Sequence, residues 1–94
     1  MTILQTMAIR IIQEQELIIG PIAWDEAKKV NGLEVVYDKR EVKMLQDDPQ
    51  VVDRLVHQYE RLFGRASVEV CKEAVRDMIS EVPKDQLPVA LQEN

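Results

Sequence analysis

The chain of 94 residues contains two stretches that follow the same plan, one displaced from the other by 44 positions. Residues 11–30 and 55–74 each consist of an apolar helical segment, a glycine and a second helical segment. The equivalent pairs are Glu16 and Glu60, Ile18 and Leu62, Ile19 and Phe63, Gly20 and Gly64, Trp24 and Val68, Ala27 and Cys71, and Lys28 and Lys72. Two helix–Gly–helix units around a middle segment leave no room for a separate active-site domain.

The agreement between the two stretches is confined to apolar positions, the glycines and a few charges. Gln15 stands opposite Tyr59, and Pro21 stands opposite Arg65. The repeat therefore supports a packing plan rather than a duplicated functional site. A chance similarity between two amphipathic hairpins with glycine stops remains the alternative.

Hydrophobic periodicity and stop signals predict two helices in the first third of the chain, over residues 2–19 and 21–30. Apolar residues recur at spacings of three and four along the first helix, and additional isoleucines widen this stripe into a broad face. Such a face is wider than one short helix can cover. Gly20-Pro21 separates the two helices, because proline suits the first turn of a new helix, and Asn31-Gly32 ends the second.

The middle and second half of the chain change period and then return to helix. Apolar and polar residues alternate over 33–37 and 41–45, which predicts a β-hairpin. Asp48-Pro49 predicts the start of a helix over 49–63, and Ser67 is the predicted N-cap of a helix over 67–82. The expected fold is α+β, mostly α, with one domain over residues 1–83 and a loosely held tail over 84–94.

Charge and composition exclude several classes of function. The net charge is −5 and no segment is basic, so neither general nucleic-acid binding nor attachment to an anionic membrane surface is expected. The apolar N-terminus is interrupted by polar residues and resembles neither a membrane span nor a signal peptide. With Cys71 as the single cysteine, a reducing cytoplasm is the expected location and a small buried residue the expected role for this thiol.

Few residues suggest chemistry. Asp53, His57 and Glu60 lie near one helical face, where they could share a metal or a proton, but a solvated histidine beside surface carboxylates is the favoured interpretation of this spacing. The turn at Gly64 could belong to a helix-turn-helix, but acidic residues alternate with Lys72 and Arg76 on the following helix, which disfavours DNA. We therefore expect a non-enzymatic protein without a cofactor or a metal.

The segment Ile19-Gly20-Pro21-Ile22-Ala23, followed by Ala27, resembles short helix–Gly-Pro–helix modules attached to bacterial serine/threonine kinases, cyclases and response regulators. Residues 62–74 are similar, with Arg65 in place of the proline. The resemblance covers some 20 residues at each place. It implies a bacterial regulatory or interaction module and carries over no catalytic residue.

The broad apolar first helix and the lone hairpin predict a protein that works through its surfaces, as a homodimer or with a protein partner. The predicted interface residues are Leu4, Ile11, Gln15, Ile18 and Trp24. Two of them have alternatives: Gln15 could pair with a symmetry mate or reach water at the edge of the face, and Trp24 could be an interface anchor or a core residue. The second hypothesis for function is a small acidic transcriptional regulator or antitoxin-like protein.

Overall fold

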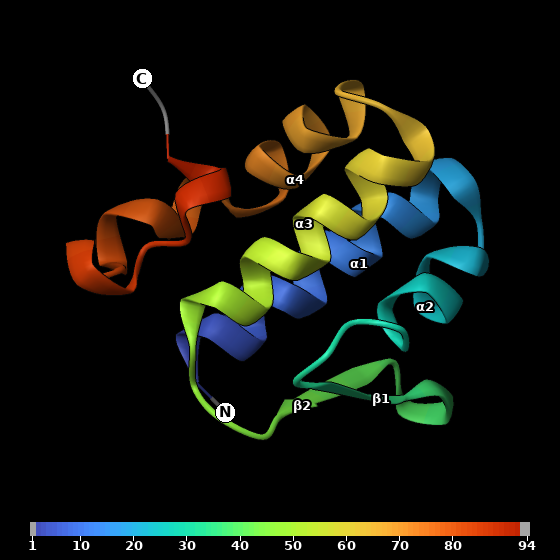
Figure 1. The fold of residues 1–94 in the computed structure, drawn as a ribbon, viewed down its shortest axis with the longest axis horizontal. Helices are drawn as coiled ribbons and strands as arrows, with labels where there is room; N and C mark the ends of the chain where they lie inside the picture. Colours follow the sequence, from blue (N-terminus) through green and yellow to red (C-terminus); the bar gives the residue numbers. More distant parts are fainter. Residues whose placement is uncertain (1, 93–94) are drawn as a thin grey trace.

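The computed structural model describes residues 2–92, which form an α+β fold dominated by helices, as predicted (Figure 1). The elements in chain order are α1 (Ile3–Ile19), α2 (Ile22–Ala27), β1 (Leu33–Val36), η1 (Tyr37–Lys39), β2 (Glu41–Met44), α3 (Pro49–Phe63), α4 (Ala66–Val75), η2 (Arg76–Glu81), η3 (Lys84–Gln86) and η4 (Val89–Leu91), where η marks a 3-10 helix. α1 and α3 lie side by side and run in the same direction, and α4 packs against both.

α1 begins where its sequence predicts, because the Thr2 hydroxyl accepts a hydrogen bond from the Gln5 N–H (3.2 Å) and so caps the first turn. Its broad apolar face is covered by the rest of the same chain: α2, α3, α4 and β2 all pack against it. The buried residues of this helix are Leu4, Met7, Ala8, Ile11, Ile12 and Gln15. The apolar face of α1, which is too wide for one helix to cover, is therefore buried by four elements.

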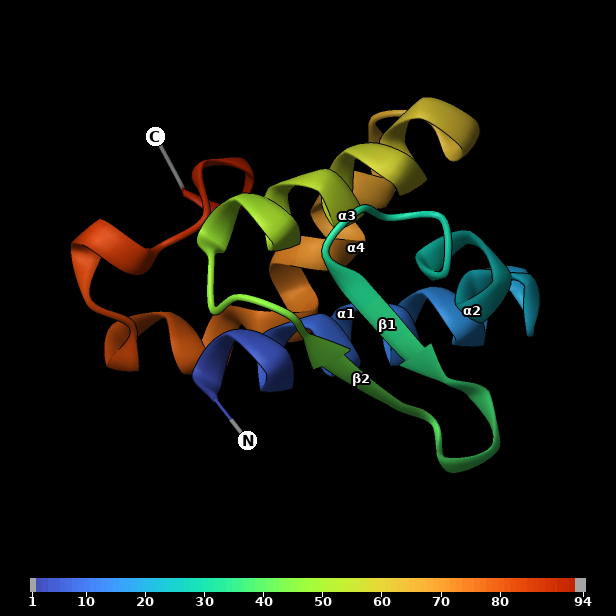
Figure 2. The same ribbon diagram turned by 60° about the horizontal axis from the view of Figure 1, so that its bottom comes forward.

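The hairpin is confirmed as two antiparallel strands, which lie along the side of α1 (Figure 2). Leu33 pairs with Met44 and Val35 with Val42, so alternate residues face the helices, and Leu33 and Val42 are buried. The Met44 N–H donates to the Gln5 Oε1 (3.4 Å), which ties β2 to α1. A two-stranded sheet is marginal by itself, and here helix packing supports it.

Two predicted helices differ from the observed ones at their ends. α2 ends at Ala27 rather than at residue 30, because the Lys29 and Val30 N–H groups bond three residues back and tighten the chain before Asn31-Gly32. α4 ends at Val75 and continues as η2. The tighter winding of three residues per turn places Val75 and Met78 on the same side, and both are buried.

Ser67 is not the N-cap that the sequence predicted for α4. The cap position is Arg65, and Ser67 is the second residue of the helix. Its hydroxyl instead donates to the Gly64 carbonyl (2.7 Å), a local bond that serine forms readily in the first turn.

The C-terminal segment packs more closely than the loose tail expected for residues 84–94. Leu91 is only 2% exposed, and η4 packs against α3 and α4. The Asp53 carboxylate accepts hydrogen bonds from the backbone N–H groups of Ala90 (2.8 Å) and Val89 (3.4 Å). Residues 84–92 therefore form part of the packed structure, and positions 93 and 94 lie outside the described residues.

Candidate interaction surface

The two helix–Gly–helix corners have the same backbone conformation. Gly20 has φ 80° and ψ −166°, and Gly64 has φ 88° and ψ −178°, a region that only glycine adopts readily. The Gly20 N–H donates to the Glu16 carbonyl (2.9 Å), and the Gly64 N–H donates to the Glu60 carbonyl (2.8 Å). The similarity seen in the sequence is thus a similarity of structure at both turns.

The two units also exchange equivalent hydrogen bonds. The Gln15 Nε2 donates to the Ser67 carbonyl (3.1 Å), and the Tyr59 hydroxyl donates to the Ala23 carbonyl (2.7 Å). Gln15 is equivalent to Tyr59 in the repeat, and Ser67 is equivalent to Ala23. Each unit therefore donates from the same position of its first helix to the same position of the other unit's second helix, as two subunits related by a two-fold axis would.

Four of the five predicted interface residues are core residues of the monomer, which corrects the prediction. Leu4, Ile11 and Trp24 are fully buried and Gln15 is 1% exposed, because the other helices of the chain cover them. The amide of Gln15 finds its partner in α4 rather than in a second copy, and also donates to the Cys71 Sγ (3.4 Å). Only Ile18, at 62% exposed, remains available to a partner.

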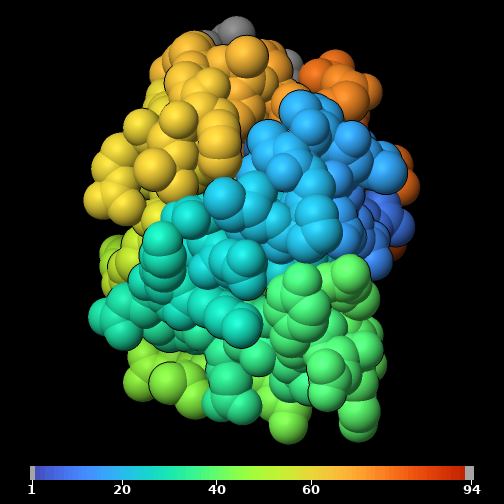
Figure 3. All heavy atoms as spheres, turned by 90° about the vertical axis from the view of Figure 1, so that its right-hand side faces the viewer, coloured from blue at the N-terminus to red at the C-terminus, as the bar shows by residue number. Residues whose placement is uncertain are grey.

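Large apolar side chains are nevertheless exposed at the two corners. Leu17 is 79% exposed, and Leu62, the equivalent of Ile18, is 47% exposed. Because α1 and α3 run in the same direction, both corners lie at one end of the molecule, and Figure 3 shows the two segments on the same face. We call these residues the corner surface: Leu17, Ile18, Ile22, Leu62 and Phe63.

The sequence contained a signal for this surface that periodicity obscured. Each of the five residues lies within three positions of Gly20 or Gly64. Residues in the last turn before a helix stop have no following turn of their own helix beside them, so their apolar side chains are covered only where another element reaches them. A cluster of apolar residues on both sides of a helix stop is thus a candidate for exposure.

Exposed charges of opposite sign lie close to the two corners in the sequence. Glu14 and Asp25, near the first corner, are exposed and make no ion pair with any residue that the structure describes. Arg61 and Arg65, near the second corner, are also exposed. Arg65 forms a solvent-exposed salt bridge with Glu60 (3.4 Å), and such a salt bridge contributes little to stability.

The suggested chemical cluster of Asp53, His57 and Glu60 is not assembled. Asp53 is occupied by the backbone of η4, and Glu60 pairs with Arg65. Within residues 2–92, no group of three His, Cys, Asp or Glu side chains is placed to hold a metal ion. The spacing on α3 therefore reflects two separate structural contacts beside an exposed histidine.

Two buried titratable groups, the Cys71 thiol and the Tyr59 hydroxyl, are held in their neutral forms. Burial raises the pKa of the Cys71 thiol to about 11, and the hydrogen bond from Gln15 only partly offsets this effect. Burial also raises the pKa of Tyr59 well above its ordinary value, and the nearby Cys71 adds to the increase. Both groups are therefore protonated at neutral pH, as a core position requires.

Comparison with known protein families, with curated proteins and with solved structures found no match for this chain. Within the described residues, no helix combines the length and the apolar character needed to cross a membrane.

Proposed function

We propose that this chain is a non-enzymatic interaction module of the cytoplasm that forms a homodimer through the corner surface. The observation that carries the proposal is the presence of five large apolar side chains, Leu17, Ile18, Ile22, Leu62 and Phe63, exposed at one end of a small molecule. Exposed apolar residues gathered in one place commonly mark interaction sites, whereas single exposed ones need no explanation.

The charges around the corner surface favour a second copy as the occupant. Glu14 and Asp25 lie close to the first corner in the sequence, and Arg61 and Arg65 lie close to the second. A two-fold axis through this end would place the acidic side of one copy against the basic side of the other, twice. An interface that uses the same patch on both subunits requires such self-complementarity.

The apolar residues would supply most of the affinity. Burying one leucine or isoleucine side chain fully is worth about 1.5–3 kcal/mol, and the most exposed residues, Leu17 and Ile18, have the most to gain. The surrounding ion pairs would set the orientation, because charges at the edge of an interface act more on specificity than on affinity.

Sedimentation velocity over a range of protein concentrations tests the proposal. We expect the wild-type chain to dimerise with increasing concentration and Ile18→Glu to remain monomeric. Leu45→Glu is the matched control, because Leu45 is 76% exposed and follows the hairpin rather than a corner. Circular dichroism would establish that both variants are folded, which is expected since neither side chain lies in the core.

A wild-type chain that sediments at 10.9 kDa at all concentrations would overturn the homodimer. Equal loss of association in Leu45→Glu and Ile18→Glu would also contradict it, because a general effect of added negative charge would then explain both variants.

A further inference from the structure

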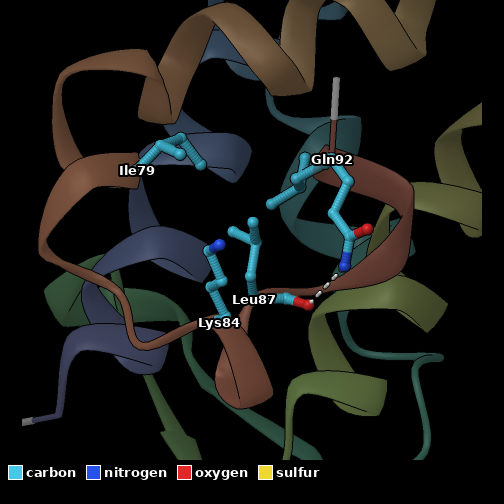
Figure 4. Close-up of a pocket in the computed structure, with 5 residues that line it drawn as sticks. Ile79, Lys84, Leu87 and Gln92 are labelled. Carbon is cyan, nitrogen blue, oxygen red and sulfur yellow. Dashed lines mark hydrogen bonds between the residues drawn. The ribbon is translucent and has the colours of Figure 1, made fainter. Parts of the chain in front are cut away.

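A second surface feature lies in the C-terminal part of the fold, among segments that the corner surface does not involve. The side chains of Ile79, Lys84, Leu87, Leu91 and Gln92 line a pocket of about 440 Å³. They come from η2, from η3 and the residue after it, and from η4 and the residue after it. Figure 4 shows Ile79, Lys84 and Leu87 arranged around one hollow, with Gln92 on the opposite side.

The lining is apolar with one positive charge. Ile79 and Leu87 supply most of the aliphatic surface, the 2% exposed Leu91 adds little to it, and Lys84 supplies an ammonium group. Lys84 forms no ion pair with any other residue of the part of the chain that the structure describes. An aliphatic hollow lined by one cation is complementary to a molecule with an apolar body and one negative group.

The walls of the pocket are held together by the fold itself. The Gln92 Nε2 donates to the Leu87 carbonyl (3.3 Å), which connects η4 to the segment before it, as the dashed line in Figure 4 shows. The Asp53 carboxylate accepts hydrogen bonds from the N–H groups of Val89 and Ala90, so η4 is also tied to α3. Hydrogen bonds of the fold therefore shape the hollow, as is usual for small-molecule sites.

We propose that this pocket binds an aliphatic monocarboxylate of medium chain length. Its hydrocarbon chain lies against Ile79, Leu87 and Leu91, and its carboxylate accepts hydrogen bonds from the Lys84 Nζ. The volume is within the range of small-ligand sites. Polyanions such as nucleotides are poorly matched, because the lining contains one cation and mostly apolar side chains. The proposal does not depend on dimerisation.

Titration followed by two-dimensional 1H–15N spectra of the full chain tests the site with three probes of equal chain length. Decanoate carries the negative group, decan-1-ol has no charge and decyltrimethylammonium has the opposite charge. We expect decanoate to bind tightest and to shift the amide signals of residues 79, 84, 87, 91 and 92. Lys84→Met keeps most of the aliphatic side chain but removes the charge, and should weaken decanoate binding roughly tenfold.

Two further variants separate the parts of the site. Lys39→Met removes an exposed lysine from η1 and should leave decanoate affinity unchanged. Leu87→Ser should weaken binding of decanoate and decanol alike, because it removes apolar wall rather than charge. Both lysines are exposed, so their substitution should not impair folding.

Equal affinities for decanoate and decanol, or equal decanoate affinities for the wild type and Lys84→Met, would overturn the proposal. So would signal changes confined to residues outside the pocket, for example at the corner surface. Sedimentation without any probe tests the homodimer separately, and the two proposals can therefore fail independently.

Discussion

The two helix–Gly–helix corners have the same backbone conformation but differ in the side-chain contacts around them. At the first corner the Glu16 carboxylate accepts a hydrogen bond from the Trp24 Nε1 (2.9 Å) and pairs with Arg40 (3.3 Å) of the hairpin turn. The Arg40 guanidinium also lies over the Trp24 ring, 5.5 Å from its centre. Among the residues that the structure describes, the equivalent carboxylate at the second corner, Glu60, pairs only with Arg65, at the surface.

The two corners therefore share the backbone conformation of the glycine turn. The side-chain contacts that hold each turn in place differ between them. A glycine before a short second helix, with its N–H bonded four residues back, can be formed twice from local sequence alone. The first corner, however, supports the hairpin, which needs a partner beyond its own two strands. Trp24 and Arg40 connect that corner to the hairpin. The second corner does not support a hairpin among the described residues.

The equivalent residues Trp24 and Val68 give the largest expected contrast. Trp24→Ala should lower the free energy of unfolding by about 3–5 kcal/mol, because it empties a large core site. Val68→Ala removes far less volume and should cost about 1.5 kcal/mol. Urea unfolding followed by far-ultraviolet circular dichroism would measure both. Equal costs at the two positions would mean that the corners are anchored alike.

The equivalent pair Ala27 and Cys71 predicts a difference in alkaline stability. The pKa of Cys71 is raised from its ordinary value of 9.0 to about 11, so the unfolded chain ionises first as the pH rises. The stabilisation is complete below pH 9 and is lost between pH 9 and 11, by about 2–3 kcal/mol. Cys71→Ala, which copies Ala27, should lack this loss while keeping the separate contribution of Tyr59. Parallel stability profiles for the two proteins from pH 8 to 11 would contradict the assignment.

The reciprocal hydrogen bonds predict two smaller and matching effects. Tyr59→Phe removes the bond to the Ala23 carbonyl, and Gln15→Met removes the bond to the Ser67 carbonyl, each with little change of shape. Each variant should lose about 1 kcal/mol of stability by equilibrium unfolding. If a variant is as stable as the wild type, the hydrogen bond that it lacks does not contribute to the free energy of unfolding.

Exchanging the residues after the glycines should have the smallest effect, and a favourable one. Arg65 has φ −62° and ψ −32°, close to the conformation of Pro21, and the preceding Gly64 is extended in ψ, as a residue before proline prefers. Arg65→Pro should therefore stabilise the chain by about 0.4–1 kcal/mol, through a less flexible unfolded state. Thermal unfolding at low protein concentration would detect it, and a destabilised variant would mean that the second corner needs freedom that the first does not.

The outline of the fold was predictable because its signals are local. The limits of α3 follow from Asp48-Pro49 and Gly64, and those of the hairpin from a change of period. The ends of α2 and α4 were less predictable, since the 3-10 turns that follow them are selected by packing of Met78 and by the turn before Gly32. The prediction of an interface from the width of the α1 face was wrong for the residues that other helices cover.

The sequence by itself determined where the helices, the two glycine corners and the hairpin lie, because caps, glycines and hydrophobic periods act over a few residues. Only the tertiary structure decided which apolar residues are inside. Gln15 and Trp24 are buried because α4 and Arg40 reach them from distant parts of the chain. Leu17 and Ile18 are exposed because no other element within residues 2–92 covers them. Coverage depends on contacts between residues far apart in sequence, and the local clusters at Gly20 and Gly64 mark only candidates for exposure.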